Sequence, residues 1–419
     1  MIMLKRLIIL FLLLISSCSN LLTWHLDKGI HRQAKIDTNQ SSSQQVIDNE
    51  IISKIDISAT LIWSKSINSG LEGNSAYLHS NKTNDTIYTV DTDGLLSAID
   101  LTSGDINWNI PTNREISSGL SFINNSICLG TARAKLICHN VDLLASNRHT
   151  PIISSLSNLT TFSEYPADIE LDLITELAAP VVAINNLFLL KLDNDDLYLI
   201  NPANGEFIWK SESQNIPLRT KGSSKPLYID NTVFIARDNG SVSSYNAIDG
   251  SLNWFTIISS RSGRNDLESQ RDAEMQITID NQKLYYGHFQ GELNALDINT
   301  GNIVWTSPFS FINDIVINDN SIYGTTSDNL LVSIDQSSGF LNWKSKNSNE
   351  KLTQPFIIDD VVMAFTTNGT LVAFNKNGNL AYEKKFELAI HSQTQFIQDG
   401  NKLYFQTVDG DIVHFIINL

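Results

Sequence analysis

The chain has 419 residues and carries 45 acidic against 29 basic side chains, a formal net charge of −16. Hydrophobic residues make up 42% and aromatic residues 9%, a composition typical of a chain that folds around an apolar core. Nucleic-acid binding needs Lys and Arg clustered on one face, so the acidic balance argues against a nucleic-acid partner.

The N-terminus has the order of a secretory signal. Lys5 and Arg6 precede nine unbroken apolar residues, 7–15, and small residues follow. Nine apolar residues are too few to span a bilayer, because a spanning helix needs about 20. We therefore expect residues 1–17 to be a signal peptide; the alternative, a short buried helix, has no partner helix in the next forty residues. Without residues 1–17 the chain keeps 27 basic and 45 acidic residues, a net charge of −18.

Residues 15–18, Ile-Ser-Ser-Cys, resemble the bacterial lipobox, in which the cysteine is lipidated and becomes the mature N-terminus. The resemblance implies that Cys18 is a lipid anchor, and Ser19 in place of Asp implies export to the outer membrane. Stable anchoring takes more than one acyl chain, which a multiply acylated cysteine supplies. Residues 18–57 include the polar stretch NQSSSQQ (39–45) and show no sustained period, so we expect a tether.

From residue 86 onward the chain repeats a strand-turn-strand unit of fifteen residues. The eight copies occupy residues 86–100, 126–140, 187–201, 232–246, 283–297, 321–335, 361–375 and 402–416. The ninth column is Gly in five copies and Asn329 in a sixth, which suits the positive φ of a tight hairpin turn. The third column is mostly bulky and the thirteenth mostly small, and these columns fall near one another across a hairpin. Each copy is therefore expected to be a β-hairpin.

A second Gly turn follows five of the copies and leads to a tryptophan, at Trp108, Trp209, Trp254, Trp305 and Trp343. Each such turn is expected to feed a fourth, outer strand, and another strand lies ahead of each copy. Four short strands in a period of about 40 to 50 residues are typical of propeller blades. The last copy lacks an outer strand, while LIWSKS (61–66) has a tryptophan with no hairpin before it. The sequence thus predicts an all-β, eight-bladed β-propeller of four-stranded antiparallel blades over residues 58–419, closed by the N-terminal strand; a solenoid is the alternative.

The pattern D-x-x-(T/S)-G-x-x-x-W is clearest in DLTSGDINW (100–108) and DINTGNIVW (297–305). It resembles the tryptophan-docking repeat of pyrroloquinoline-quinone-type propellers, whereas the dipeptides of WD40 propellers are absent. Within that superfamily, an acylated eight-bladed chain of this length resembles the BamB family, lipoproteins of the β-barrel assembly machinery. The resemblance covers nearly all of residues 58–419.

This resemblance implies a non-enzymatic adaptor of the BAM complex without a cofactor, lipid-anchored in the cell outer membrane with its propeller in the periplasm. The implied partners are the POTRA domains of the barrel-forming subunit BamA, other BAM subunits, nascent outer-membrane β-barrel proteins and membrane lipid. The alternative is a periplasmic quinone-dependent dehydrogenase or another propeller enzyme. Such dehydrogenases are typically longer and often carry a vicinal disulfide, whereas this chain has no adjacent cysteines.

Signals for catalysis or metal binding are weak. DTDG (91–94) and DNDD (193–196) offer carboxylates for a calcium loop, but both occupy the hairpin-turn column, so we favour turns. No G-x-S-x-G elbow occurs, and the eight histidines do not pair at zinc-site spacings. We therefore assign no catalytic and no metal-binding residue.

The connections 213–226 and 264–277 follow consecutive blades, so we expect them to lie side by side on one face. In the BamB family their counterparts, a Leu-Arg pair and two acids separated by one residue, contact the partner. The resemblance therefore implies partner contacts for Leu218, Arg219, Asp272 and Glu274, with Glu274 in place of the family's second Asp. The alternative is a surface ion pair between neighbouring loops, worth about 0 to 1 kcal/mol.

The second copy of the repeat differs from the others in two ways. Cys128 and Cys138 occupy its facing third and thirteenth columns, so in an exported protein they form either a cross-strand disulfide or two buried thiols. Residues 144–180 replace the tryptophan-bearing outer strand expected after this copy. We therefore expect an irregular second blade.

Overall fold

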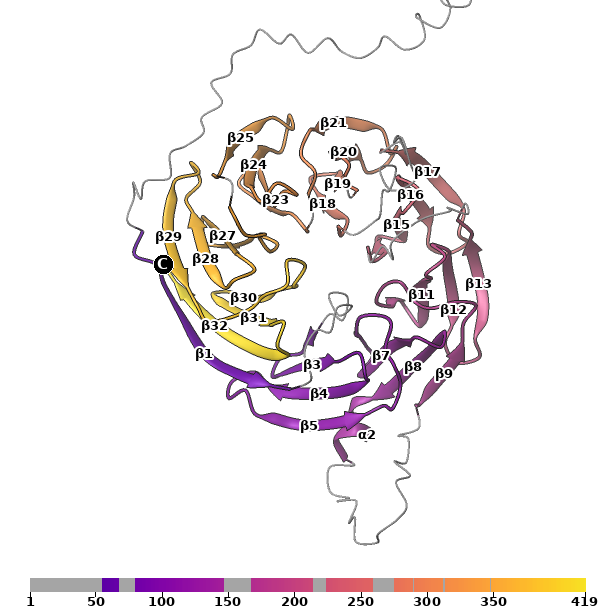
Figure 1. Cartoon of the computed structure of the whole chain (residues 1–419). Coiled ribbons are helices and arrows are strands. Elements are labelled where there is room, and N and C mark those ends of the chain that lie inside the picture. Colours follow the sequence, from indigo (N-terminus) through magenta and orange to yellow (C-terminus); the bar gives the residue numbers. More distant parts are fainter. Residues whose placement is uncertain are drawn as a thin grey trace, which may run out of the picture. The chain divides into compact units, whose positions relative to one another are not determined.

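Figure 1 shows the computed structural model of the chain, in which eight four-stranded sheets are arranged in a ring. The structure describes residues 55–67, 80–146, 167–213, 224–258, 275–288, 290–311, 313–346 and 348–419. The chain divides into two units, residues 1–45 and 46–419, and every described residue belongs to the second. The predicted eight-bladed β-propeller is confirmed.

Each blade is a sheet of four antiparallel strands. In blades 1 to 7 they pair in chain order with the first strand toward the centre of the ring (Figure 1), whereas in blade 8 the N-terminal strand is the outer one. Blades 1 to 4 consist of β2 (Asn81–Lys82), β3 (Thr86–Val90), β4 (Leu95–Asp100) and β5 (Ile106–Pro111); β6 (Ser121–Ile123), β7 (Ser126–Thr131), β8 (Lys135–Asn140) and β9 (Ile169–Asp172); β10 (Val182–Ile184), β11 (Leu187–Lys191), β12 (Leu197–Asn201) and β13 (Glu206–Ser211); β14 (Leu227–Ile229), β15 (Thr232–Arg237), β16 (Ser241–Asn246) and β17 (Leu252–Ile257).

The remaining blades follow the same plan. Blades 5 to 8 consist of β18 (Thr278–Asp280), β19 (Lys283–Tyr286), β20 (Leu293–Asp297) and β21 (Ile303–Ser307); β22 (Val316–Asn318), β23 (Ser321–Thr325), β24 (Leu331–Asp335) and β25 (Leu341–Lys344); β26 (Phe356–Ile358), β27 (Val361–Phe365), β28 (Thr370–Phe374) and β29 (Leu380–Lys385); β30 (Ile397–Asp399), β31 (Lys402–Gln406), β32 (Asp411–Asn418) and β1 (Ser58–Ser66).

The column pattern of the repeat sets the hairpin register. Bulky third-column residues face small thirteenth-column residues across the strands, as in Tyr88 opposite Ala98 and Met363 opposite Ala373. Ninth-column residues take a positive φ at Gly94, Ala134, Asp195, Gly240, Asn329, Gly369 and Gly410. In blade 5 the positive φ, 55°, falls on Gln290 instead of the ninth-column glycine. The predicted hairpins are thus confirmed, with the turn of blade 5 displaced by one residue.

Neighbouring blades are joined by the outer-strand tryptophans. Gly301 in the second turn of blade 5 has φ +69°, and a Cβ placed on it would lie 2.4 Å from the ring of Trp254 in blade 4. Glycine is required there because the indole lies against its backbone. Trp254 Nε1 also donates a hydrogen bond of 2.9 Å to the Ile298 carbonyl. The same indole-to-carbonyl bond joins Trp209 to Ala247, Trp305 to Gln336 and Trp343 to Lys376.

The N-terminal strand closes the ring, as predicted. β1 pairs antiparallel with β32, and Figure 1 shows the two strands side by side at the junction of blades 8 and 1. Trp63 of β1 lies 2.6 Å from the Cβ position of Gly104 in blade 1, which repeats the indole-on-glycine contact of the other tryptophans but not their hydrogen bond to a carbonyl. Blade 8 therefore takes three strands from the C-terminal end of the propeller and one from its N-terminal end.

Blade 2 corrects one expectation from the sequence. Its outer strand β9 pairs with β8, so residues 144–180 contain that strand instead of replacing it. β9 has no tryptophan, and Leu171 approaches within 3.3 Å of the Cβ position of Gly205 in blade 3. A short helix, α2 (Val141–Ser146), directly follows β8. The blade is irregular in its connection, whereas its sheet is complete.

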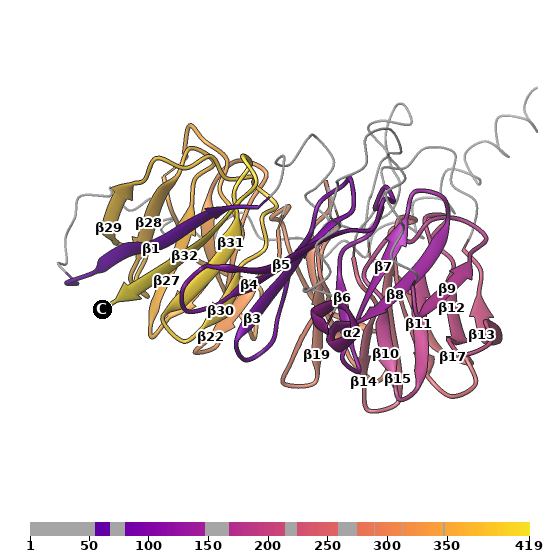
Figure 2. The ribbon, with the colours of Figure 1, turned by 90° about the horizontal axis from the view of Figure 1, so that it is seen from below.

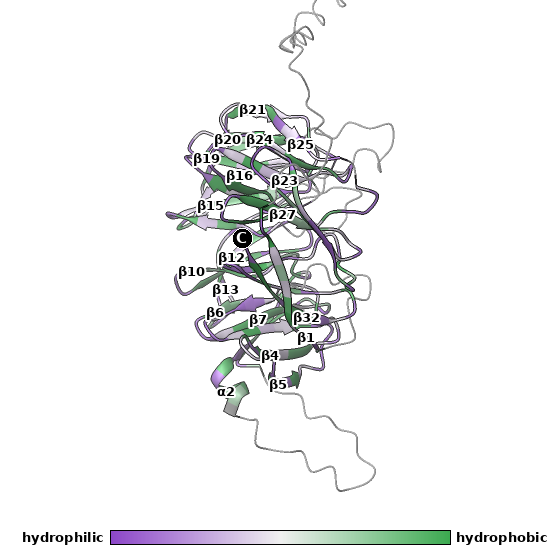
Figure 3. Cartoon of the chain, turned by 90° about the vertical axis from the view of Figure 1, so that its left-hand side faces the viewer, coloured by the Kyte–Doolittle hydropathy of each residue, from purple (hydrophilic) through white to green (hydrophobic). Residues whose placement is uncertain are grey.

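The apolar core lies between the faces of neighbouring blades. One buried cluster includes Phe234 of blade 4, Tyr285 of blade 5 and Val332 of blade 6. Figure 3 shows hydrophobic residues along strands such as β16 and β27 and hydrophilic residues in many of the loops. Cys128 and Cys138 are buried and form a disulfide, with a Cα–Cα distance of 4.1 Å. No helix within the described ranges is long and apolar enough to cross a membrane.

Candidate docking face

One face of the ring carries the features that bear on function. Because the strands alternate in direction, the turns between second and third strands and the connections between blades emerge on the same side; Figure 2 shows the blades side-on. This side is termed the connection face. It is defined by the hairpin turns at residues 91–94, 131–134, 192–195, 237–240, 288–291, 326–329, 366–369 and 407–410.

Five residues predicted from the sequence lie outside the described residues: Cys18, Leu218, Arg219, Asp272 and Glu274. The C-terminal ends of the two predicted contact loops are described. There the Lys225 backbone N–H donates a hydrogen bond of 2.8 Å to Gln276 Oε1. These two ends therefore lie side by side, in agreement with the expected adjacency, while the contacts of the five residues stay predictions.

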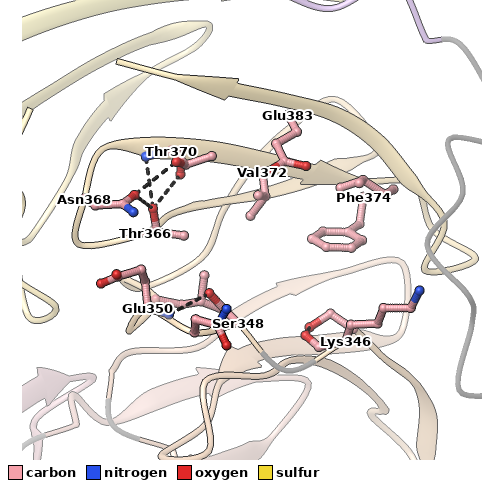
Figure 4. Close-up of a pocket in the computed structure, with 13 residues that line it drawn as sticks. Lys346, Ser348, Glu350, Thr366, Asn368, Thr370, Val372, Phe374 and Glu383 are labelled. Atoms are coloured by element: carbon pink, nitrogen blue, oxygen red, sulfur yellow. Dashed lines mark hydrogen bonds between the residues drawn. The ribbon is translucent and has the colours of Figure 1, made fainter. Parts of the chain in front are cut away.

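In five blades a single side chain closes the hairpin turn on the connection face. The sixth column of the repeat is Thr or Asp there, and its oxygen accepts the backbone N–H four residues later. In blade 7, Thr370 N–H donates to Thr366 Oγ1 at 3.0 Å; Figure 4 shows this turn in the wall of a cavity of about 390 Å³ lined by blades 6 and 7. The equivalent caps are Asp91, Thr131, Thr326 and Thr407.

The two acidic sequences considered as calcium loops are hairpin turns. Asp91 Oδ1 accepts the Leu95 backbone N–H at 2.6 Å, and Asp195 has a φ of 67° at the corner of its turn. Burial raises the pKa of Asp91, and the hydrogen bond from Leu95 opposes that shift. Within the described part of the chain, no three His, Cys, Asp or Glu side chains come together in an arrangement suited to a metal ion.

Blades 3, 4 and 5 depart from this turn chemistry. Their sixth-column residues are Leu192, Arg237 and His288. In blades 3 and 4 an eighth-column asparagine, Asn194 or Asn239, accepts the turn N–H instead.

A buried ion pair lies in the turn of blade 3. Lys191, only 1% exposed, places its Nζ 3.4 Å from Asp195 Oδ1, which is also 1% exposed. An ammonium and a carboxylate are rarely found so deeply buried unless they are paired.

Lys191 and Arg237 connect this pair to the backbone of two blades. Lys191 Nζ donates to the carbonyls of Ser224, at 3.3 Å, and Ala236, at 3.2 Å. Arg237 donates from Nη1 to the Asp195 carbonyl at 2.6 Å and from Nη2 to Ser211 Oγ at 3.0 Å. The rigid guanidinium fork therefore binds blade 3 at two points.

Burial and the Lys191 ammonium act on the pKa of Asp195 in opposite directions. Burial raises the pKa of Asp195, the Lys191 ammonium lowers it and the Asp238 carboxylate raises it further. The Asp238 backbone N–H also donates to Asp195 Oδ2 at 2.9 Å. In blade 5, His288 Nε2 lies 2.9 Å from the Arg237 carbonyl, so the polar network extends over three consecutive blades.

A second polar site lies among the inner strands. A cavity of about 320 Å³ is lined by residues of seven blades, among them Asn81, Leu120, Pro180, Lys225, Asp314 and Gln395. Asp314 Oδ1 accepts the Gln276 backbone N–H at 2.7 Å. Burial raises the pKa of Asp314 to about 6, and this hydrogen bond opposes the shift. Asp314 thus fixes the end of the second contact loop.

The sequence analysis missed Lys191, Asp195 and Arg237 as members of one site. The signal was present in the sixth column, where Thr or Asp in five copies gives way to Leu192, Arg237 and His288. The column shows the departure, but it does not show which residues of neighbouring blades meet. Those contacts depend on the packing of one blade on the next.

Comparison with known proteins places the fold and the family. The family model described as outer membrane protein assembly factor BamB matches residues 170–345 and 321–417. The chain is similar to the outer membrane protein assembly factor BamB of Moranella endobia, with 24% identity over 85% of this chain and 89% of that one, and of Escherichia coli, with 21% identity over 84% and 88%.

Among solved structures, the crystal structure of BamB from Moraxella catarrhalis superposes with a TM-score of 0.70 at 18% identity. It covers 86% of this chain and 100% of that one, and it supports the fold. The computationally designed Ika8 protein shares the fold at a TM-score of 0.58 and 13% identity, over 83% and 98% of the two chains. Because the family model spans more than half of the sequence, this chain belongs to the family of the outer membrane protein assembly factor BamB.

Proposed function

We propose that the chain is a non-enzymatic adaptor of the BAM complex that assists the folding and insertion of outer-membrane β-barrel proteins. The observation that carries this proposal is the BamB family match over residues 170–417. The adaptor binds the POTRA domains of BamA and thereby takes part in the complex with the other BAM subunits and their client proteins. Its contribution is positioning, since a propeller offers broad loop-bearing faces to a partner.

The contact residues of this proposal are Leu218, Arg219, Asp272 and Glu274. They belong to two loops whose described ends lie side by side, at Lys225 and Gln276. An arginine combines a rigid set of donors with a long apolar stem, and an adjacent leucine adds apolar area, which is a combination common at interface centres.

The proposed location is the periplasmic side of the outer membrane. Residues 1–17 act as the signal peptide, Cys18 carries the lipid, residues 18–57 form the tether and the propeller begins at residue 58. Cys18→Ala is expected to abolish acylation and to release a soluble or uncleaved form, measured by fractionation and mass spectrometry. A Cys18→Ala protein that is cleaved and still fractionates with the outer membrane would contradict the anchor.

A pull-down from solubilised membranes, with identification of the bound partners, tests the function. Recovery of the barrel-forming subunit supports the adaptor. The competing function is a quinone-dependent dehydrogenase, and co-purified quinone and calcium without that subunit would overturn the proposal. The assembly factors among the relatives favour the adaptor.

A further inference from the structure

The two proposed contact loops connect the three blades in which the sixth-column residue does not cap the turn. One loop, 213–226, connects blade 3 to blade 4, and the other, 264–277, connects blade 4 to blade 5. Proteins tend to depart from a locally consistent pattern where function requires it. Stability alone is a weak reason for a buried ion pair, because apolar residues of similar size often serve as well. We therefore expect the buried cluster of Lys191, Asp195 and Arg237 to have a role that is specific to these blades.

The contacts of the cluster lie at both ends of the first loop. Before the loop, Arg237 Nη2 donates to Ser211 Oγ at 3.0 Å, and the Ser213 backbone N–H donates to Asp196 Oδ1 at 2.6 Å. After the loop, Lys191 Nζ donates to the Ser224 carbonyl at 3.3 Å. The cluster thus binds Ser211 before the loop and Ser224 after it, while Ser213 is bound by the neighbouring Asp196.

We propose that Lys191, Asp195 and Arg237 are positioning residues that hold the ends of the 213–226 loop in the arrangement that the partner binds. Fixing the described ends of the loop before binding reduces the conformational entropy that association costs at those ends. Asp195 acts by holding Lys191 through the 3.4 Å ion pair and Arg237 through its carbonyl. The inference rests on the proposed function, because it assumes that this loop meets BamA.

The test compares a paired neutral variant with a matched control in the full chain. Lys191→Met combined with Asp195→Asn removes both charges together and leaves no unpaired buried ion. The control, Thr407→Val, removes the turn cap of blade 8, where Asp411 N–H donates to Thr407 Oγ1 at 3.1 Å. For each protein we would measure affinity for purified BamA, the melting temperature and hydrogen exchange of peptides that cover residues 205–213 and 224–230.

The paired variant is expected to bind about tenfold more weakly, with faster exchange at both loop ends and a melting temperature within a few degrees of the parent. The control should keep the parent affinity and the parent exchange at the loop ends. Binding of the paired variant at the parent affinity, or unchanged exchange at the loop ends, overturns the inference.

Two further comparisons distinguish a failure of the inference from a failure of the proposed function or of folding. If the parent chain itself does not bind BamA, the proposed function fails, while hydrogen exchange still decides whether the cluster holds the loop ends. If the paired variant does not fold, Arg237→Lys replaces it, because lysine keeps the charge and loses the fork that reaches Ser211. Its expected result is weaker binding and faster exchange at residues 205–213, and parent values for both would overturn the inference.

Discussion

Blades 6 to 8 and blades 3 to 5 share one hairpin plan but differ on the connection face. In blades 6 to 8 a threonine in the sixth column closes its own turn, a contact within five residues of the chain. In blades 3 to 5 that threonine is missing, and Arg237 instead reaches from blade 4 to the backbone of blade 3. The threonine contacts therefore stay within one blade, whereas Arg237, which replaces a threonine, connects two blades.

The joint at the border of the two regions resembles a joint inside blades 3 to 5. Trp209, which joins blade 3 to blade 4, and Trp305, which joins blade 5 to blade 6, both donate to a carbonyl of the next blade, at 2.9 and 3.1 Å. Both also lie within 3 Å of the Cβ position of a glycine, Gly250 and Gly339. The joint inside blades 3 to 5 and the joint at their border with blade 6 are thus built alike.

The largest expected loss of stability comes from removing one partner of the buried Lys191–Asp195 ion pair. Lys191→Met leaves the Asp195 carboxylate buried next to Asp238, which should lower the free energy of unfolding by about 3 to 5 kcal/mol. Thr326→Val, in blade 6, removes one turn hydrogen bond, from the Leu330 N–H, and should cost about 1 kcal/mol. Denaturant unfolding measures both, and equal losses would remove the distinction between the two regions.

A second experiment tests whether the joints are alike. Gly250→Ala and Gly339→Ala each place a Cβ within 3 Å of an indole, at φ values of +71° and +75°. The strained φ and the forced shift of the ring together should cost about 2 to 4 kcal/mol. We expect the two melting temperatures to fall by similar amounts, and a loss confined to one variant would show that the joints differ.

The smallest effect concerns Asp314, which binds the end of the second loop from blade 6. Its pKa of about 6 lies above the usual 3.8, so the folded state holds the proton more tightly than the unfolded state. The neutral carboxyl therefore makes its full contribution to the free energy of unfolding below about pH 4, and this contribution is lost as the pH rises through 6.

Asp314→Asn keeps an acceptor for the Gln276 N–H and removes the charge. We expect it to raise the free energy of unfolding by about 1 to 2 kcal/mol at pH 7.5, because partial exposure to the cavity reduces the full effect of the shift. At pH 4 the variant and the parent should agree. Urea unfolding at the two pH values checks this, and an identical gain at both would contradict the raised pKa.

Much of the fold could be predicted because the same residue pattern recurs in each blade. The third and thirteenth columns predicted the hairpin register, and the unpaired strands at the two ends predicted the closure by β1. β9 was missed because it lacks the tryptophan by which the other outer strands were found. The register also predicted that Cys128 faces Cys138, but it left open whether the sulfurs are bonded.

The candidate site could be predicted only in part. Equivalent positions in consecutive blades were enough to predict that the two contact loops have adjacent ends. Asp195 lies only four residues from Lys191. The other partners of Lys191 and Arg237 could not be predicted, because they lie in another blade or beyond a loop, at separations of 26 to 45 residues. Such contacts follow from blade-on-blade packing, which the repeat pattern does not encode.

We propose that the connection face binds BamA through the two loops. The most direct measurement is the affinity of the full chain for purified BamA, with the melting temperature determined alongside, for Arg219→Glu, Asp272→Arg and the control Lys225→Glu. We expect both loop variants to weaken binding by about tenfold or more and to keep a melting temperature close to that of the parent. Lys225→Glu should have a smaller effect on the affinity. Unchanged affinity for both Arg219→Glu and Asp272→Arg would contradict the proposal.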